Sequence, residues 1–220
     1  MGIATALAIV ALTIPLFLNP FWVAFEQGRS GASAWTGFSD ADLQRATGSI
    51  LSDLVVGPPA FDVEVGGSPV LDERERSHMR DVRVVFGGFF VLAVIATLSA
   101  LVIATRRRAD AQRRTWLAVR AGAVGLIVGL VVVGVVAVVA FDALFETFHR
   151  VLFTSGSYDF DPRTERLVQL FPFQFWQDSA IALGIAAVIV ALVVAWVAAR
   201  RLGASAARVP SAASLERSRP

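Results

Sequence analysis

Four long apolar runs divide this chain, and they constrain its fold more than any other feature. They cover residues 3–18, 84–105, 121–141 and 179–199. A bilayer core about 30 Å thick is crossed by roughly 20 helical residues, a length that the last three runs reach and the first approaches. Only 17% of the residues are charged, and the mean hydropathy is +0.64. The sequence therefore predicts an all-α integral membrane protein with four transmembrane helices.

The first run is the shortest, and a cleaved signal peptide is the alternative interpretation of it. No Arg or Lys precedes the run, however, and the bulky residues Asn19, Pro20, Phe21 and Trp22 follow it in place of a small-residue cleavage site. A tryptophan at this point suits the interface between membrane and water. We therefore expect an uncleaved anchor.

Arginine clusters predict the orientation of the chain. Residues 106–120 contain six arginines and one acid, and residues 200–219 contain five arginines and one acid. Because such clusters stay on the cytoplasmic side, both termini are expected inside and the segments 23–83 and 143–178 outside. This gives one membrane domain over residues 1–202 and a disordered cytoplasmic tail over residues 203–220, which is rich in Ala, Ser, Pro and Arg.

Composition excludes several kinds of chemistry. The chain has no cysteine and no lysine, so disulfides, zinc–thiolate sites, cysteine nucleophiles and lysine Schiff bases are excluded. Its arginines follow the topology and are not interleaved with aromatic residues on one face, which argues against nucleic-acid binding. No cofactor is expected.

Each outer segment contains local signals for structure. Residues 61–71 alternate around Gly66 and Gly67, which predicts a short extracytoplasmic β-hairpin. Asp72 and Glu75 have the spacing of a capping box, so a helix is expected to begin there and to continue into the second span. The second outer segment is expected to begin as a continuation of the third span, with an apolar face at helical spacing that starts at Phe141.

Glycines in the third span predict close helix packing. Gly125 and Gly129 form a G-x-x-x-G pattern, with Gly122 and Gly134 nearby. Small residues at this spacing let helix backbones approach each other. We expect contact with another helix of the same chain, and a homodimer face is the less favoured alternative.

The chain's only two histidines, His78 and His149, are predicted at similar depth at the outer face of the membrane. Glu75 and Asp81 share a helical face with His78. Glu146 and Arg150 lie within one turn of His149, and Asp142 lies within two turns of it. A carboxylate beside a histidine fixes the imidazole tautomer and raises its basicity, as acid–base catalysis requires. Two unrelated surface histidines explain the same spacing equally well.

The strings around the two histidines resemble the signatures of a known bacterial family. Residues 72–82 read D-E-R-E-R-S-H-M-R-D-V, and residues 145–153 read F-E-T-F-H-R-V-L-F, followed by Phe160-Asp161-Pro162 and Phe171-Pro172. They are similar to the motifs of the four-span family that includes the Lit lipoprotein intramolecular transacylases. The resemblance implies an acyltransferase of the bacterial cytoplasmic membrane whose partners are membrane lipid and a diacylated lipoprotein. It would move an acyl chain from the diacylglyceryl group to the α-amine of the N-terminal cysteine, with the two histidines as catalytic residues.

Such a transfer needs a base for the amine proton, an acid for the leaving oxygen and a stabiliser for the oxyanion. We assign the proton transfers to His149, and oxyanion stabilisation or substrate orientation to His78. The supporting residues expected around them are orienting carboxylates and cations for the oxyanion or the substrate carbonyls: Glu75, Asp81, Asp142, Glu146, Arg80 and Arg150. Ser155 and Ser157 would permit an acyl-serine route, but turn residues are the preferred interpretation.

Two alternatives remain open. One is a non-catalytic membrane protein that binds a partner through its outer loops. The other is a metal-dependent enzyme that uses both histidines and nearby acids, although no H-E-x-x-H pattern is present. A transporter is less favoured, because the spans carry almost no internal polar residues.

Overall fold

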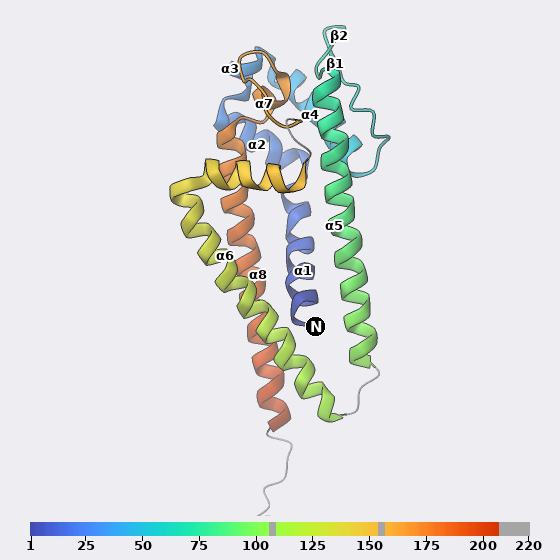
Figure 1. The fold of residues 1–220 in the computed structure, drawn as a ribbon, viewed down its shortest axis with the longest axis vertical. Coiled ribbons are helices and arrows are strands. Elements are labelled where there is room, and N and C mark those ends of the chain that lie inside the picture. Colours follow the sequence, from blue (N-terminus) through green and yellow to red (C-terminus); the bar gives the residue numbers. More distant parts are fainter. Residues whose placement is uncertain (106–108, 154–156, 207–220) are drawn as a thin grey trace, which may run out of the picture. The chain divides into compact units, whose positions relative to one another are not determined.

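The fold is that of a computed structural model, which describes residues 1–105, 109–153 and 157–206. It consists of helices and one pair of short strands (Figure 1). In chain order these are α1 (Gly2–Thr13), the 3-10 turn Ile14–Leu16, α2 (Pro20–Ser30), α3 (Ala32–Thr36), α4 (Asp40–Val55), β1 (Glu64–Val65), β2 (Ser68–Pro69), α5 (Glu73–Thr105), α6 (Ala109–Leu152), α7 (Arg166–Leu170) and α8 (Phe173–Ala206). Three groups of residues named in the sequence analysis lie outside the described residues: Arg106 to Arg108, Ser155 and the tail from residue 207.

Three helices, α5, α6 and α8, are each long and apolar enough to cross a membrane. The first predicted span is different, because residues Gly2–Leu16 are followed by α2 at a bend of 71°. Asn19 caps α2 at this break, where its side chain accepts from the backbone N–H groups of Phe21 and Trp22. The described residues thus contain three candidate spans, or four if the bent pair counts as one.

Residues 203–206 were expected to belong to a disordered tail, and that part of the prediction is wrong. Helix α8 continues to Ala206, so residues 203–206 are helical although Gly203 lies among them. A single glycine inside a helix costs only about 1 kcal/mol relative to alanine, which the long preceding helix tolerates.

Helix α6 is bent at Ala140, whose backbone (φ −149°, ψ 44°) is not helical. We refer to residues 141–152 as the α6 arm. Figure 1 shows the arm as the yellow end of α6, turned away from the direction of the preceding residues. The second outer segment was expected to begin as a continuation of the third span, and α6 does continue through it to Leu152, but with a bend that the sequence analysis did not predict. The arm begins just before Asp142, the first charged residue after the apolar run.

The chain forms two compact units, each with its own apolar contacts. Unit 1 contains residues 1–10, 93–131 and the part of the chain from 186 onward. Its core comprises Ile9, Ala123, Ala187 and Ala191. Here Gly122 meets the first helix so closely that an added Cβ would lie 2.2 Å from the carbonyl oxygen of Gly2. The close approach was predicted, but it uses Gly122, whereas Gly125 and Gly129 face open space.

Unit 2 contains residues 11–92 and 132–185 and has a larger core, made by α2, α4, the β-hairpin, the start of α5, and α7 with the start of α8. Gln27 of α2 is buried and donates to Thr47 of α4 and to the carbonyl of Leu170 at the end of α7. Helix α3 packs against α7, and Arg166 donates to the carbonyl of Thr36. The sequence analysis identified none of the helices α2, α3 and α4.

The hairpin and the start of α5 were predicted and are confirmed. Strands β1 and β2 pair antiparallel, with Val65 opposite Ser68 across the two glycines. The capping box is present with both of its hydrogen bonds: the Glu75 N–H donates to Asp72 Oδ1 over 2.8 Å, and the Asp72 N–H donates to Glu75 Oε2 over 2.7 Å. These bonds fix the residue at which α5 begins.

The first eleven residues of α5 cannot lie in hydrocarbon. They include seven charged side chains, the last of which is Arg83, and the apolar run begins at Val84. With 33 residues, α5 is about 50 Å long, well beyond a bilayer core of about 30 Å. His78 therefore belongs to the part of α5 that precedes the membrane-spanning segment, and His149 belongs to the amphipathic arm that follows the third apolar run.

Candidate active site

The two histidines, which are 71 positions apart in the sequence, lie next to each other in unit 2. The ring centroids of His78 and His149 are 6.0 Å apart, and their planes are within 25° of parallel. His78 is 5% exposed and comes from the charged start of α5, whereas the partly buried His149 comes from the α6 arm. The bend at Ala140 directs the arm, and with it His149, away from the direction of the third span.

Aromatic rings enclose both imidazoles. Phe153 contacts both histidines, with centroids 4.8 Å from His78 and 5.5 Å from His149. Phe160 lies edge-on to His78 at 5.5 Å, and Tyr158 lies 5.2 Å from His149. Phe145 lies one turn before His149 on the arm, at 4.2 Å. The enclosure lowers the local polarity around the two imidazoles.

The tautomer of His149 follows from one hydrogen bond. Its Nδ1 lies 2.8 Å from the carbonyl oxygen of Phe145. A carbonyl oxygen can only accept, so Nδ1 carries the proton and Nε2 holds the free lone pair. His149 is thus oriented with Nε2 as a proton acceptor. His78 differs, because its buried Nδ1 has no hydrogen-bond partner within residues 1–105, 109–153 and 157–206.

Both histidines are neutral at physiological pH. Burial, assisted by the neighbouring His149, lowers the pKa of His78 from 6.5 to about 4, although Asp81 opposes the shift. Burial also lowers the pKa of His149, against the opposing effect of its bond to Phe145. One can therefore act as a base, and the other as a neutral donor or acceptor.

The lowered pKa of His78 makes a prediction about acid stability. The unfolded chain protonates this histidine near pH 6.5 and the folded chain only near pH 4, so its contribution is complete above pH 6.5 and is lost as the pH falls. We expect it to remove about 3 kcal/mol of stability over that range. The measurement is the Tm in detergent between pH 7.5 and 4.5, for the wild type and for His78→Phe, which keeps an aromatic ring in the enclosure. If both proteins lose Tm equally steeply, groups other than His78 are responsible.

Glu75 is buried and does not serve the histidines in the way the sequence analysis expected. Its Oε2 accepts from the Asp72 N–H, and its Oε1 accepts from the Leu167 N–H over 2.6 Å. Desolvation by burial raises the pKa of the Glu75 carboxyl group. Both carboxylate oxygens therefore bind backbone, and the side chain ties the start of α5 to α7.

Arg74 holds the Phe160 wall of the enclosure, and the sequence analysis did not single it out. Its guanidinium lies over the Phe160 ring at 4.5 Å, donates to the Asp159 carbonyl over 2.8 Å, and forms an ion pair with Glu165. Glu165 in turn accepts from the Asp161 N–H over 2.5 Å. The E-R-E string of the motif thus has a structural explanation, in which Arg74 and Glu75 fix the two segments that border His78.

The other predicted supporting residues lie on exposed surfaces. Asp81 is exposed, and its influence on His78 is electrostatic. Arg80 pairs with Glu73 at 2.5 Å, back toward the helix start. The remaining three lie on the exposed face of the arm, with Glu146 and Arg150 3.8 Å apart: Asp142, Glu146 and Arg150.

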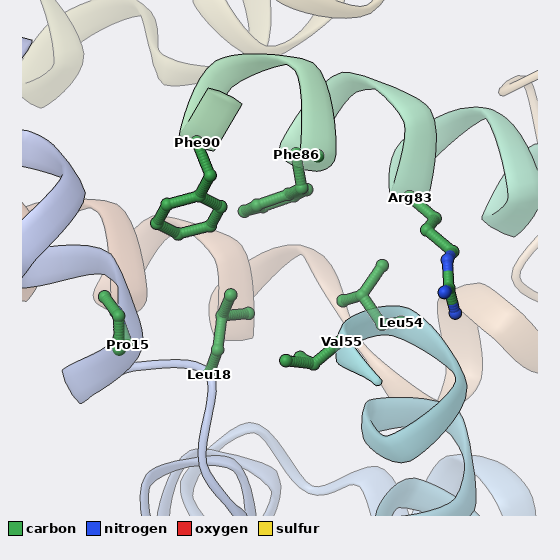
Figure 2. A pocket seen from close by; sticks show the side chains of 8 residues that line it. Pro15, Leu18, Leu54, Val55, Arg83, Phe86 and Phe90 are labelled. Atoms are coloured by element: carbon green, nitrogen blue, oxygen red, sulfur yellow. The ribbon is translucent and has the colours of Figure 1, made fainter. Parts of the chain in front are cut away.

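A groove of about 260 Å³ elsewhere in unit 2 is separate from the histidine pair. Figure 2 shows Phe86 and Phe90 of α5 facing Leu18, Leu54 and Val55, with Arg83 at one end. The Arg83 guanidinium donates to the Gly57 carbonyl over 2.6 Å and to the Asp53 carbonyl, and so caps the end of α4. The α5 residues of the groove are about 80–180° around the helix from His78, so it is not part of the histidine site.

The part of the chain that the structure describes contains no cluster of side chains suited to a metal ion. No group of three or more His, Asp or Glu side chains that could hold a metal ion occurs there. Zinc sites in proteins use three or four such ligands. The metal-dependent alternative therefore has the two histidines but no third ligand among these residues.

Comparison with known proteins gives the family. Residues 1–176 match the family described as lipoprotein intramolecular transacylase Lit. The chain belongs to the Lit family. Its membership makes it an acyltransferase, and it places His78 and His149 in the matched region. No curated protein matches the chain.

Solved Lit structures from Bacillus cereus share the fold. One, named as the membrane integral lipoprotein intramolecular transacylase Lit, is 16% identical, with a TM-score of 0.70 over 91% of each chain. A second, with a histidine-to-arginine mutation, is 15% identical, with a TM-score of 0.72 over 95% of this chain and 91% of the other. Like these Lit structures, the chain is an integral membrane protein with several apolar helices.

Proposed function

We propose that this protein is a lipoprotein intramolecular transacylase. It would take one acyl chain from the diacylglyceryl group on the N-terminal cysteine of a bacterial lipoprotein and transfer it to the α-amine of the same cysteine. The observation that carries the proposal is the stacked pair of neutral histidines, 6.0 Å apart inside an aromatic enclosure beside the apolar spans. Family membership supplies the reaction class.

The reaction exchanges an ester for an amide. The amine nitrogen attacks the ester carbonyl, a carbon–nitrogen bond forms, and a tetrahedral oxyanion results. The carbon–oxygen bond to glycerol then breaks, and the proton released by the amine ends on the glycerol oxygen. The product is the lyso form, with one glyceryl ester and one N-acyl chain. No oxidant, reductant or cofactor is needed.

His149 is the proposed proton carrier. Its Nδ1–H is occupied by the Phe145 carbonyl, so Nε2 can take the proton from the attacking amine and return it to glycerol. The hydrogen bond to Phe145 also stabilises the charged imidazolium that forms between the two transfers. The α-amine has an ordinary pKa of about 7.7–8.0, so a neutral imidazole is a suitable partner near neutral pH.

His78 is the proposed oxyanion donor. With a pKa of about 4 it stays neutral through the cycle and therefore carries one N–H. A neutral donor in a buried enclosure stabilises developing negative charge without first being desolvated. The unpartnered Nδ1 supports this role, because a polar atom held without a partner at a site is available to a substrate.

The orientation of the chain fits this chemistry. We infer that both termini lie in the cytoplasm and that the histidines face the outer leaflet of the bacterial cytoplasmic membrane. The arginine clusters at residues 106–120 and 200–219 support this topology. Mature lipoproteins present their lipidated cysteine at that leaflet, so the acyl chains can stay in lipid while the ester reaches the histidines.

Mass spectrometry of a lipoprotein's N-terminal lipopeptide tests the proposal. The gene is expressed in a bacterium that lacks its own apolipoprotein N-acyltransferase. We expect a lipopeptide of unchanged total mass whose fragments show one acyl chain on the amine and one on the glycerol, because the transfer is intramolecular.

The control is the same host without the gene, in which both chains stay on the glycerol. If the folded, expressed wild type leaves the lipopeptide unchanged, the reaction proposed here is wrong.

A further inference from the structure

A second groove in unit 2 lies where α2 meets the start of α8, and it contains a buried acid that the reaction does not use. It has a volume of about 230 Å³. The residues that line it are Trp22, Phe25, Glu26, Arg29, Asp178, Ile181, Ala182 and Ile185. None of them belongs to the aromatic enclosure of the histidines.

Glu26 is the unusual member of this set. It is only 2% exposed, and its Oε2 has no hydrogen-bond partner among the described residues. The nearest cation is Arg29, whose Nε lies 3.7 Å away, within ion-pair range but too far for a good hydrogen bond. A buried carboxylate oxygen left unsatisfied is costly, so its presence in a groove marks a place for a donor.

The charges around the groove favour a donor that is positively charged. Arg29 is shared with a second carboxylate, because its Nη2 also donates to Asp178 Oδ2 over 3.1 Å. Two acids share one base here, and burial raises the pKa of Glu26, so a cationic donor would stabilise its ionised form. The Phe25 ring, 5.8 Å from Trp22, already has the Arg29 guanidinium over it at 5.7 Å, and Trp22 adds an aromatic ring that favours a further cation.

The position of the groove at the membrane interface indicates what the rest of the ligand is. Asp178 is the last charged residue before Arg200, so the apolar run of α8 begins directly after it. Trp22 is anchored at this level by its Nε1–H, which donates to Ser179 Oγ over 3.0 Å. Ile181 and Ile185 follow at one-turn spacing and are exposed on the lipid-facing run. Polar groups at the interface and an apolar wall below it match a glycerophospholipid.

We propose that this groove binds a membrane phospholipid whose headgroup carries a primary ammonium, as in phosphatidylethanolamine. The ammonium donates to the Glu26 carboxylate, the phosphate faces the half-exposed Arg29 guanidinium, and an acyl chain lies along Ile181 and Ile185. A primary ammonium is favoured over a quaternary one because only the former has N–H groups to donate. An anionic lipid is disfavoured by the two carboxylates.

Native mass spectrometry of the purified full chain tests this without reference to acyl transfer. The protein in detergent is mixed with equal amounts of dioleoyl phosphatidylethanolamine, phosphatidylglycerol and phosphatidylcholine. We expect the ethanolamine lipid to be retained about tenfold more than the other two, as for one charge-assisted hydrogen bond. Equal retention of the three lipids, or a preference for the glycerol lipid, overturns the proposal.

Variants locate the preference in the groove. Glu26→Gln should abolish it, while Glu64→Gln, which changes an exposed acid of the hairpin, should not. Ala182→Phe should also abolish it by filling the groove, whereas Ala180→Phe on the exposed side of the same helix should leave it unchanged. If Glu26→Gln does not fold, the alanine pair decides. A preference that survives either groove variant excludes this site.

Discussion

Replacing His149 with alanine is expected to reduce the rate of acyl transfer by about 10³-fold, the usual range for loss of a general acid–base group. The reason is the single free nitrogen of this ring: Nδ1 is bonded to the Phe145 carbonyl, so only Nε2 can exchange a proton with the substrate. Loss of the imidazole removes the acceptor for the amine proton and the donor for the glycerol oxygen together. The measurement is the rate at which N-acyl lipopeptide appears, by mass spectrometry, with purified enzyme and diacylglyceryl lipopeptide.

Two further variants are compared with His149→Ala in the same assay. Thr147→Ala changes an exposed residue two positions earlier on the same arm and should keep nearly full activity. His78→Ala removes one oxyanion donor and should cost about 10²-fold. If His78→Ala is inactive while His149→Ala retains most of its rate, the two roles must be exchanged. If both retain it, the histidines are not catalytic.

The sequence predicted the features of the site that depend on local spacing. The Asp72–Glu75 capping box, the Gly66-Gly67 turn and the helical phase of His78 need only neighbours within a few residues. Both histidines could be placed near the same membrane face, because each follows or precedes an apolar run whose length the bilayer fixes. Their 6.0 Å separation is consistent with that placement, but depth alone does not predict which helix faces meet.

The features that the sequence did not predict depend on contacts between distant segments. The bend at Ala140 has no proline or glycine at that position, and those are the residues that usually mark a kink. The available signal was amphipathicity, since charges appear from Asp142 onward and a helix with one polar face is stable along the interface. Arg74 was overlooked because its partners, Phe160 and Glu165, are more than 80 positions away.

Glu75 is the residue whose role in the structure differs most from the role that the sequence predicted. Its replacement is expected to cause the largest loss of stability. Glu75→Ala leaves two backbone donors, the N–H groups of Asp72 and Leu167, without their acceptors. Each buried donor without a partner costs about 1–3 kcal/mol, and the two together should lower the Tm by about 10 °C for a chain of this size. Activity should fall with it, because α7 loses its tie to the start of α5, which carries His78.

The Tm in detergent and the transfer rate should be measured together for three variants. Glu73→Ala is the matched control, because Glu73 is exposed and its ion pairs with Arg76 and Arg80 are open to solvent on its side, so a shift of no more than about 2 °C is expected. Glu75→Gln should be intermediate, since its one remaining oxygen can accept from a single N–H while its amide group opposes the other donor. If Glu75→Ala abolishes transfer but keeps the wild-type Tm, the carboxylate acts on the histidine chemistry, as the sequence spacing predicts. If the two fall together, Glu75 fixes the positions of the segments between which the histidine pair is held.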